Sequence, residues 1–216
     1  MPEVTVDEAA SDENHERLAD LFGDILRIER YGVGCQWFPP WDDLVRWWGV
    51  EQALRDMALR PELVHAAIDR LVSAYLCRLE QYEKLNLLSL NNGNFNIGSG
   101  GFGFTDELPQ KDFDPGTVTT RDQWGCATAQ IFSEVSPEMH WEFALQYEMK
   151  WLERFGLTYY GCCEPLHNKM QILKRIPNLR KVSMSPWVDA EKAIPHMAGR
   201  YVYSCKPNPA VLAMEH

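Results

Sequence analysis

Long apolar runs are missing from this sequence. No uninterrupted apolar stretch approaches the roughly 20 residues that an α-helix needs to span a bilayer. The first 20 residues are acidic, whereas a secretory signal begins with a basic segment followed by an apolar one. We therefore expect neither a transmembrane helix nor a secretory signal, and we expect a cytoplasmic protein.

Basic residues are also scarce. The 21 Lys and Arg residues face 31 Asp and Glu residues, which gives a formal net charge of −10. A surface of this sign repels phosphate backbones and anionic lipid headgroups. The charge therefore argues against nucleic acid and membranes as partners, and we expect a small-molecule substrate.

What the sequence does contain is enough apolar material for one globular domain. Hydrophobic residues make up 45% of the 216 positions, so a single domain over residues 1–216 is expected, with residues 1–15 flexible. The six cysteines do not form a recognisable disulfide framework, and without an export signal they are more simply free thiols.

The apolar periodicity predicts alternating strands and helices. Helices are expected over residues 61–84 and 137–155, and strands over 85–90, 157–163, 179–184 and 200–205, with short helices over 165–176 and 187–197. The last three strands begin about 22 residues apart, as in parallel βα units. We therefore predict an α/β fold of the (β/α) TIM-barrel type, incomplete and half-barrel-like, with an N-terminal helical segment.

A glycine-rich stretch over residues 91–120 follows the first predicted strand. So many glycines leave little regular structure, and long loops in compact domains are usually binding loops or lids. We expect this segment to cover the ends of the strands.

Polar side chains follow the predicted strands where each one ends. In parallel βα folds the reactive groups gather at the carboxyl ends of the strands. We therefore predict five substrate-binding residues at these ends: Asn91, Asn92, Ser185, Lys206 and Asn208.

Cysteine, glutamate and histidine at the same strand ends are ligands that zinc accepts, and a catalytic zinc needs three protein ligands and one open position. The candidate metal ligands are Cys162, Cys163, Glu164, His167 and Cys205. The alternative is that these cysteines are buried small hydrophobes, since free cysteine is among the most buried residue types.

Several short motifs resemble the uroporphyrinogen decarboxylase superfamily, which includes the methylcobamide:thiol methyltransferases. The helical segment 51–85 is similar to one that precedes a barrel strand in that superfamily. Residues 122–125 (Asp-Gln-Trp-Gly) and 136–138 (Ser-Pro-Glu) are similar to its Asp-x-Trp-Gly and Ser-Pro-Glu stretches. Residues 159–165 fall where the methyltransferase branch carries a His-x-Cys zinc motif, and the similarity extends over residues 41–209.

This resemblance implies an eight-stranded barrel, of which only four or five strands are found here. It also implies a corrinoid-dependent, methyltransferase-like protein in which zinc activates an acceptor thiol, methylcobamide is the methyl donor and a corrinoid protein is a partner. By this analogy Cys163 and Cys205 are zinc ligands, with Glu164 as a third ligand or a base. Asp122 would be catalytic, and Asn91 and Trp124 would contact the substrate.

Two alternatives stay open at this point. One is a metal-independent decarboxylase of a porphyrinogen-like substrate, in which Asp122 would bond pyrrole N–H groups. The other is a non-catalytic, truncated barrel or partner subunit.

An open parallel sheet also leaves two unpaired edges and an uncovered inner face, and pairing of identical halves would bury both. We therefore predict a homodimer with Leu88, Tyr160 or Val182 near the contact.

Overall fold

The computed structural model describes residues 1–214, and at its centre lies a five-stranded sheet. All neighbouring strands are parallel, and their order in the sheet follows their order in the sequence. The strands are β1 (Trp37–Phe38), β2 (Trp124–Ala127), β3 (Leu157–Tyr160), β4 (Leu179–Met184) and β5 (Val202–Cys205). Consecutive parallel order is the arrangement of successive strands in a (β/α) barrel, so the fold is mixed α/β and compatible with part of such a barrel.

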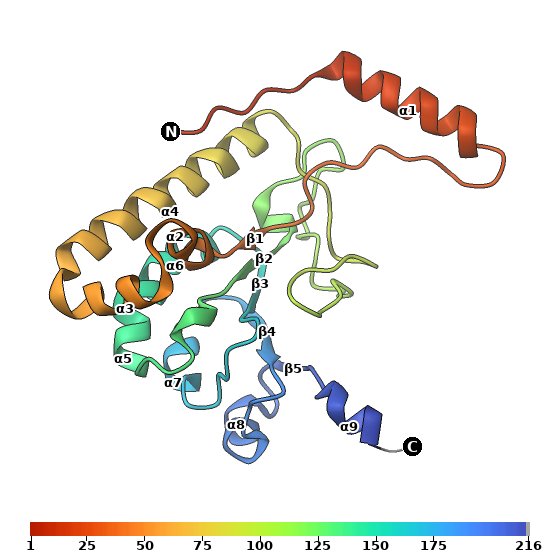
Figure 1. Ribbon diagram of the computed structural model, residues 1–216. Coiled ribbons are helices and arrows are strands. Elements are labelled where there is room, and N and C mark those ends of the chain that lie inside the picture. The colour runs from red at the N-terminus through yellow and green to blue at the C-terminus, as the bar shows by residue number, and fades with distance from the viewer. Residues whose placement is uncertain (215–216) are drawn as a thin grey trace.

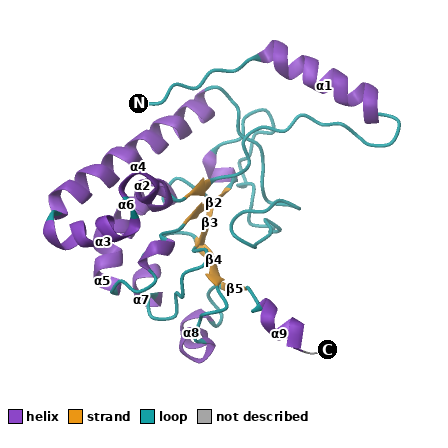
Figure 2. Ribbon diagram, in the orientation of Figure 1, coloured by secondary structure: helices purple, strands orange, loops and turns teal. Residues whose placement is uncertain are grey.

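Helices cover one face of this sheet, and a long loop covers the other (Figures 1 and 2). The α-helices are α1 (Glu8–Phe22), α2 (Pro40–Trp48), α3 (Val50–Leu59), α4 (Pro61–Lys84), α5 (Pro137–His140), α6 (Gln146–Leu152), α7 (Met170–Leu173), α8 (Ala190–Met197) and α9 (Pro209–Met214). A five-residue π-helix (Trp141–Leu145) joins α5 to α6. Within residues 1–214, no helix is both long and apolar enough to cross a membrane.

The long helix α4 confirms the prediction from periodicity. It begins at Pro61, whose fixed φ angle and missing N–H suit the first turn, and it ends at Lys84. Its buried residues, Val64, Ile68, Val72 and Leu79, recur at intervals of four and seven and therefore lie on one face. This face packs against α2, α3 and α6 and joins the main core.

The strands β3, β4 and β5 also confirm their predictions, but the amino-terminal half of the sheet does not. The segment 85–90 forms only a single bridge, from Leu88 to Val33, instead of a full strand. β1 has only two residues, too few to show a period, and β2, with four buried residues, was not predicted either. The predicted helix 165–176 is reduced to the four residues of α7.

The two faces of the sheet have separate cores because side chains alternate along each strand. Ala127 and Tyr160 belong to the large core under the helices. The other face carries a smaller apolar cluster, made of Trp124, Cys126, Leu157 and Tyr159 from the sheet with Ile97 and Leu108 from the loop. The segment 91–120, which we call the lid, therefore covers the inner face of the sheet, whereas it was predicted to cover the strand ends.

This arrangement corrects the predicted dimer contact. Tyr160 and Val182 are fully buried under the helices, and Leu88 is only 5% exposed. None of the three offers surface to a second molecule, so their placement at a contact was wrong. The inner face that they were expected to line belongs to other residues and is covered within the same chain.

The homodimer itself stays a prediction, now without those three residues. α1 has no buried residue, and it stands away from the rest of the molecule (Figure 1). We expect sedimentation velocity at micromolar concentrations to give the mass of a dimer. A folded protein that sediments as a monomer across this range would contradict the prediction.

The lid is anchored at its start by Asn91, which yields a test of the fold. Its buried side-chain amide donates to the carbonyl oxygens of Gly34 (2.8 Å) and Trp124 (2.9 Å), and its Oδ1 accepts from the N–H of Trp124 (2.8 Å). Asn91→Ala should lower the free energy of unfolding by roughly 2–4 kcal/mol, since buried backbone groups lose their partners. Urea titration measures this, and the exposed Asn94→Ala is the matched control. Equal stability of the two variants would refute the anchoring role.

Candidate functional site

The carboxyl ends of β2, β3, β4 and β5 are connected through one turn, formed by residues 161–164. The carboxylate of Glu164 accepts from the hydroxyl of Thr128 (2.9 Å), which follows β2, and from the N–H of Cys162 (2.8 Å). The carbonyl oxygen of Cys162 accepts from Ser183 Oγ on β4 (2.7 Å) and from Lys206 Nζ after β5 (2.6 Å). Three neighbouring strands therefore hold the backbone of Cys162 in place.

The turn depends on a glycine at its first position. Gly161 has a φ of 100°, a conformation that residues with a Cβ rarely adopt. A Cβ there would also lie 2.5 Å from Leu166 Cδ1 and 3.1 Å from Ser183 Cβ. The left-handed backbone turns the chain away from the strand direction directly after Tyr160. Cys162 and Cys163 therefore do not alternate across a strand as sequence reasoning assumed, and their sulfur atoms lie 3.6 Å apart.

A pocket of about 560 Å³ opens beside this turn, between the turn, β1 and the lid. Its apolar walls include Trp37, Phe95 and Ile97, and its polar groups include Ser99 and Cys162. Ligand pockets typically combine apolar walls with a few placed polar groups, and in parallel sheets they lie at the carboxyl ends of strands. This pocket meets both criteria, and we call it the carboxyl-end pocket.

The lid lies close over β3 because glycines face the ring of Tyr159. A Cβ on Gly98 would lie 2.6 Å from Cδ1 of that ring, so no larger residue fits without displacing the lid. Lys206 fixes the lid to the turn, since its ammonium group donates both to Ser99 Oγ and to the carbonyl of Cys162. Close contact with an aromatic ring thus explains the glycines at positions 98 and 101 of this segment.

A buried polar chain lies below the turn, on the helix-covered face. The phenol of Tyr160 donates to Glu148 Oε2 (2.7 Å), and its oxygen lies 2.7 Å from His140 Nε2. Because the phenol proton is used by Glu148, the N–H at His140 Nε2 donates to the phenol oxygen. Burial raises the pKa of Glu148 to about 8, and burial together with the charge of Lys169 lowers the pKa of His140 to about 3. Both side chains are therefore neutral at pH 7. In the sequence His140 ends α5 and Glu148 lies in α6, and the π-helix Trp141–Leu145 stands between these two helices.

Burial also changes the pKa of the two neighbouring ionisable groups. It raises the pKa of Glu164, against the hydrogen bonds from Cys162 and Thr128. It lowers the pKa of Lys169 to about 8, against the attraction of Glu164. Perturbed titratable groups gathered at strand ends are typical of functional sites.

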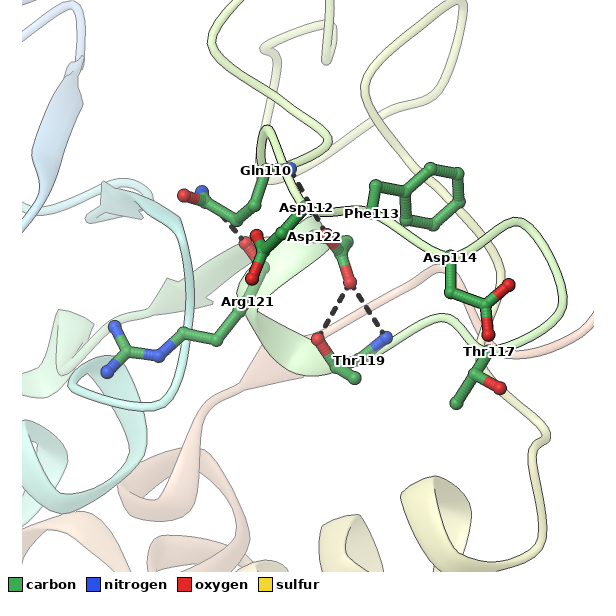
Figure 3. A pocket seen from close by; sticks show the side chains of 8 residues that line it. All are labelled: Gln110, Asp112, Phe113, Asp114, Thr117, Thr119, Arg121 and Asp122. Carbon is green, nitrogen blue, oxygen red and sulfur yellow. Dashed lines mark hydrogen bonds between the residues drawn. The ribbon is translucent and has the colours of Figure 1, made fainter.

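The structure does not bring Asp122 to this site. Asp122 precedes β2 and lies at the amino end of the sheet, opposite to Glu164. Its carboxylate accepts from Thr119 N–H (3.0 Å), Thr119 Oγ1 (2.7 Å) and Gln110 N–H (3.1 Å), as Figure 3 shows. Asp122 therefore caps a short 3₁₀ turn and lines a different pocket, of about 550 Å³.

Three other predicted substrate contacts have structural partners of their own. The side-chain amide of Asn91 already makes its hydrogen bonds with the backbone of Gly34 and Trp124. Asn92 donates to the carbonyl of Leu108 (2.6 Å), and the indole of Trp124 donates to the carbonyl of Gly103 (2.9 Å). These residues hold the lid on the sheet and do not line the carboxyl-end pocket.

The remaining predicted contacts lie nearer to the carboxyl ends. Lys206 bonds two pocket residues, as described above. Ser185 follows β4, and its Oγ is buried without a hydrogen-bond partner among the described residues. Asn208 accepts from the N–H of Ala210 (3.0 Å) at the start of α9, where it acts locally.

The five predicted metal ligands do not converge. Both oxygens of Glu164 are occupied, and His167 Nδ1 accepts from the N–H of Asp189 (3.2 Å). Cys205 pairs in register with Met184, whose side chain packs in the helix-side core, so it belongs to the opposite face from Ser204 and the lid. Among residues 1–214, no group of three or more His, Cys, Asp or Glu side chains is placed to hold a metal ion. The residues present therefore do not fit a three-ligand zinc site.

Sequence reasoning missed Cys35, Trp37, Ser99 and Thr128. Trp37 belongs to β1 and Thr128 follows β2, the two strands that were not predicted. Ser99 lies inside the glycine-rich segment, where only its position next to Gly98 and Gly100 signalled close packing.

No family model, curated protein or solved structure matches this chain. The resemblance to the uroporphyrinogen decarboxylase superfamily therefore stays a prediction from short motifs.

The raised pKa of Glu148 predicts how stability depends on pH. In the unfolded chain the carboxyl group loses its proton near pH 4.5, but in the folded protein it keeps the proton up to about pH 8. The free energy of unfolding should therefore fall as the pH rises through this window, by up to a few kcal/mol. Glu148→Gln cannot ionise and should lack this part of the decline.

Urea titrations at pH 5, 6, 7 and 8 measure the effect as the difference between variant and wild type. We expect this difference to grow with pH in favour of Glu148→Gln. The exposed Glu153→Gln, at the end of the same helix, is the matched control and should change nothing. A difference that stays constant with pH would show that Glu148 is already ionised at neutral pH in the folded protein.

Proposed function

We propose that this protein is a methyltransferase-like enzyme that binds a small thiol in the carboxyl-end pocket and moves a methyl group to its sulfur. The observation that carries the proposal is the pocket beside the Cys162 turn, held by hydrogen bonds from β2, β4 and β5. The proposed reaction class comes from the motif resemblance, as do methylcobamide as donor and a corrinoid protein as partner.

The positive charge of Lys206 is the chemical feature that suits such a reaction. Thiolates, not thiols, are the nucleophiles, and a nearby cation favours the thiolate. Burial raises the pKa of the Cys162 thiol, and the charge of Lys206 acts in the opposite direction. A substrate thiol bound beside Cys162 would lie in the same field, because Lys206 contacts both Ser99 and Cys162 in the pocket wall.

The reaction that we propose is a simple displacement. The acceptor thiol releases its proton to water at the open side of the pocket. A bond then forms between its sulfur and the methyl carbon, while the bond from methyl to the donor breaks and its electron pair stays with the donor. Zinc would supply further activation of the thiol in the methyltransferase branch. The described residues of this chain do not fit that ion, and no step here depends on it.

The decarboxylase alternative receives no support from the geometry. It relied on Asp122 as the substrate-binding group, and that carboxylate is occupied within its own loop at the opposite end of the sheet. The built pocket also favours a ligand-binding protein over a truncated remnant without a site.

Lys206→Met tests the proposal because it removes the charge and keeps most of the length of the side chain. With methylcobalamin and 2-mercaptoethanol as probes, wild-type protein should raise the rate of methyl transfer above the uncatalysed rate. Lys206→Met should lower the rate about tenfold at pH 7, the equivalent of one pKa unit in the acceptor. Its pH–rate profile should move to higher pH, so that the rate recovers in alkaline solution.

Two further variants make this test specific. Lys206→Arg keeps the charge and should restore most of the rate. Lys192→Met removes an exposed charge on α8 and should leave the profile unchanged. The assay is run with and without added zinc, and a rate no higher than the uncatalysed one under both conditions would refute the methyltransferase proposal.

A further inference from the structure

Two adjacent thiols face the same point at the mouth of the pocket. The sulfur atoms of Cys162 and Cys163 are 3.6 Å apart, although neighbouring residues in a strand would point to opposite faces. The left-handed Gly161 makes this possible, since both cysteines lie in the turn after β3. Cys163 is exposed and Cys162 lines the pocket, so one thiol meets solvent and the other meets the cavity.

The separation of the two sulfur atoms suits the binding of both to a single atom. A disulfide would need about 2.05 Å between them, so the pair is a dithiol. Two sulfur ligands at 2.3 Å from a tetrahedral ion lie about 3.8 Å apart, close to the distance found here. The backbone of Cys162 is fixed by Glu164, Ser183 and Lys206, which reduces the conformational entropy lost when both sulfurs bind one atom.

The chemistry of the surroundings decides what kind of centre fits. A zinc ion requires more protein ligands than the two thiols, and the described residues bring no third ligand to them. A trivalent arsenic atom that carries one organic group requires only two thiols, because carbon occupies its third position. The organic group would then need an apolar space beside the dithiol, and Trp37, Phe95 and Ile97 line one.

We infer that Cys162 and Cys163 form a chelating site for a trivalent monoorgano-arsenical, with the organic substituent in the adjacent pocket. In the binding reaction of an arsenoxide, two As–S bonds form and both S–H protons leave with the oxygen as one water molecule. Arsenic stays trivalent throughout, so neither an oxidant nor a reductant is required. The inference uses the same pocket as the proposed methyl transfer but does not depend on that reaction.

Phenylarsine oxide is the probe, and intact-mass spectrometry of the full chain is the readout. Wild-type protein should gain one phenylarsenic group less two hydrogens, and peptide mapping should place it on the 162–163 pair. A small monothiol should not displace it, whereas 2,3-dimercaptopropanol should. Cys162→Ser and Cys163→Ser should each weaken binding by roughly a hundredfold or more, because the second bond is then no longer intramolecular.

Matched controls separate this site from other cysteines and from loss of folding. Cys77→Ser on α4 and Cys205→Ser at the last position of β5 should bind like wild type. Cys163 is exposed, so Cys163→Ser should keep the circular dichroism spectrum and urea midpoint of the wild type. Unchanged affinity in Cys163→Ser, or an adduct that maps to Cys35 or Cys126, would overturn the inference.

The outcome is independent of the methyltransferase test. Failure of methyl transfer with normal arsenical binding would refute only the proposed function. Normal methyl transfer in Cys163→Ser, together with equal arsenical affinity of variant and wild type, would refute only the chelating site.

Discussion

A parallel sheet with helices on one side has a second face that must also be kept from water. Here the chain uses a loop for that purpose, and much of the structure depends on how closely the loop can approach. Gly98 lies so near the ring of Tyr159 that a side chain would collide with it. The indole of Trp124 then donates to the carbonyl of Gly103 in the lid, and the ammonium group of Lys206 donates to the hydroxyl of Ser99. Because the lid covers the face incompletely near β1, it leaves the pocket that we take as the candidate site.

The same sheet positions polar groups on its helix side. Tyr160 and Tyr159 are neighbours in β3, yet one lies in a buried hydrogen-bonded chain with Glu148 and His140 while the other supports the lid. Full burial keeps both Glu148 and His140 neutral. These buried groups pack below the turn that carries the two thiols, so β3 connects the polar interior to the pocket.

Local pattern was enough to predict the long elements. The apolar spacing of α4 and the βα rhythm after residue 156 depend on neighbouring residues only, and both were predicted from periodicity. β1 and β2 were not predicted, and the two residues of β1 are too few for a period to be visible. Their pairing is set by contacts between segments almost 90 residues apart in the sequence, such as Trp37 with Cys126.

The amino-acid sequence by itself determined the α/β class, the glycine-rich lid and the presence of Glu164, Lys206 and the paired cysteines at strand ends. Only the tertiary structure decided which of these residues meet. Asp122 lies at the wrong end of β2 for the site, and Cys205 lies on the other face from the lid, because strand direction and alternation set both positions. The proximity of the two thiols depends on a left-handed backbone at Gly161 and on hydrogen bonds from three strands. Sequence spacing contains no information on such long-range contacts.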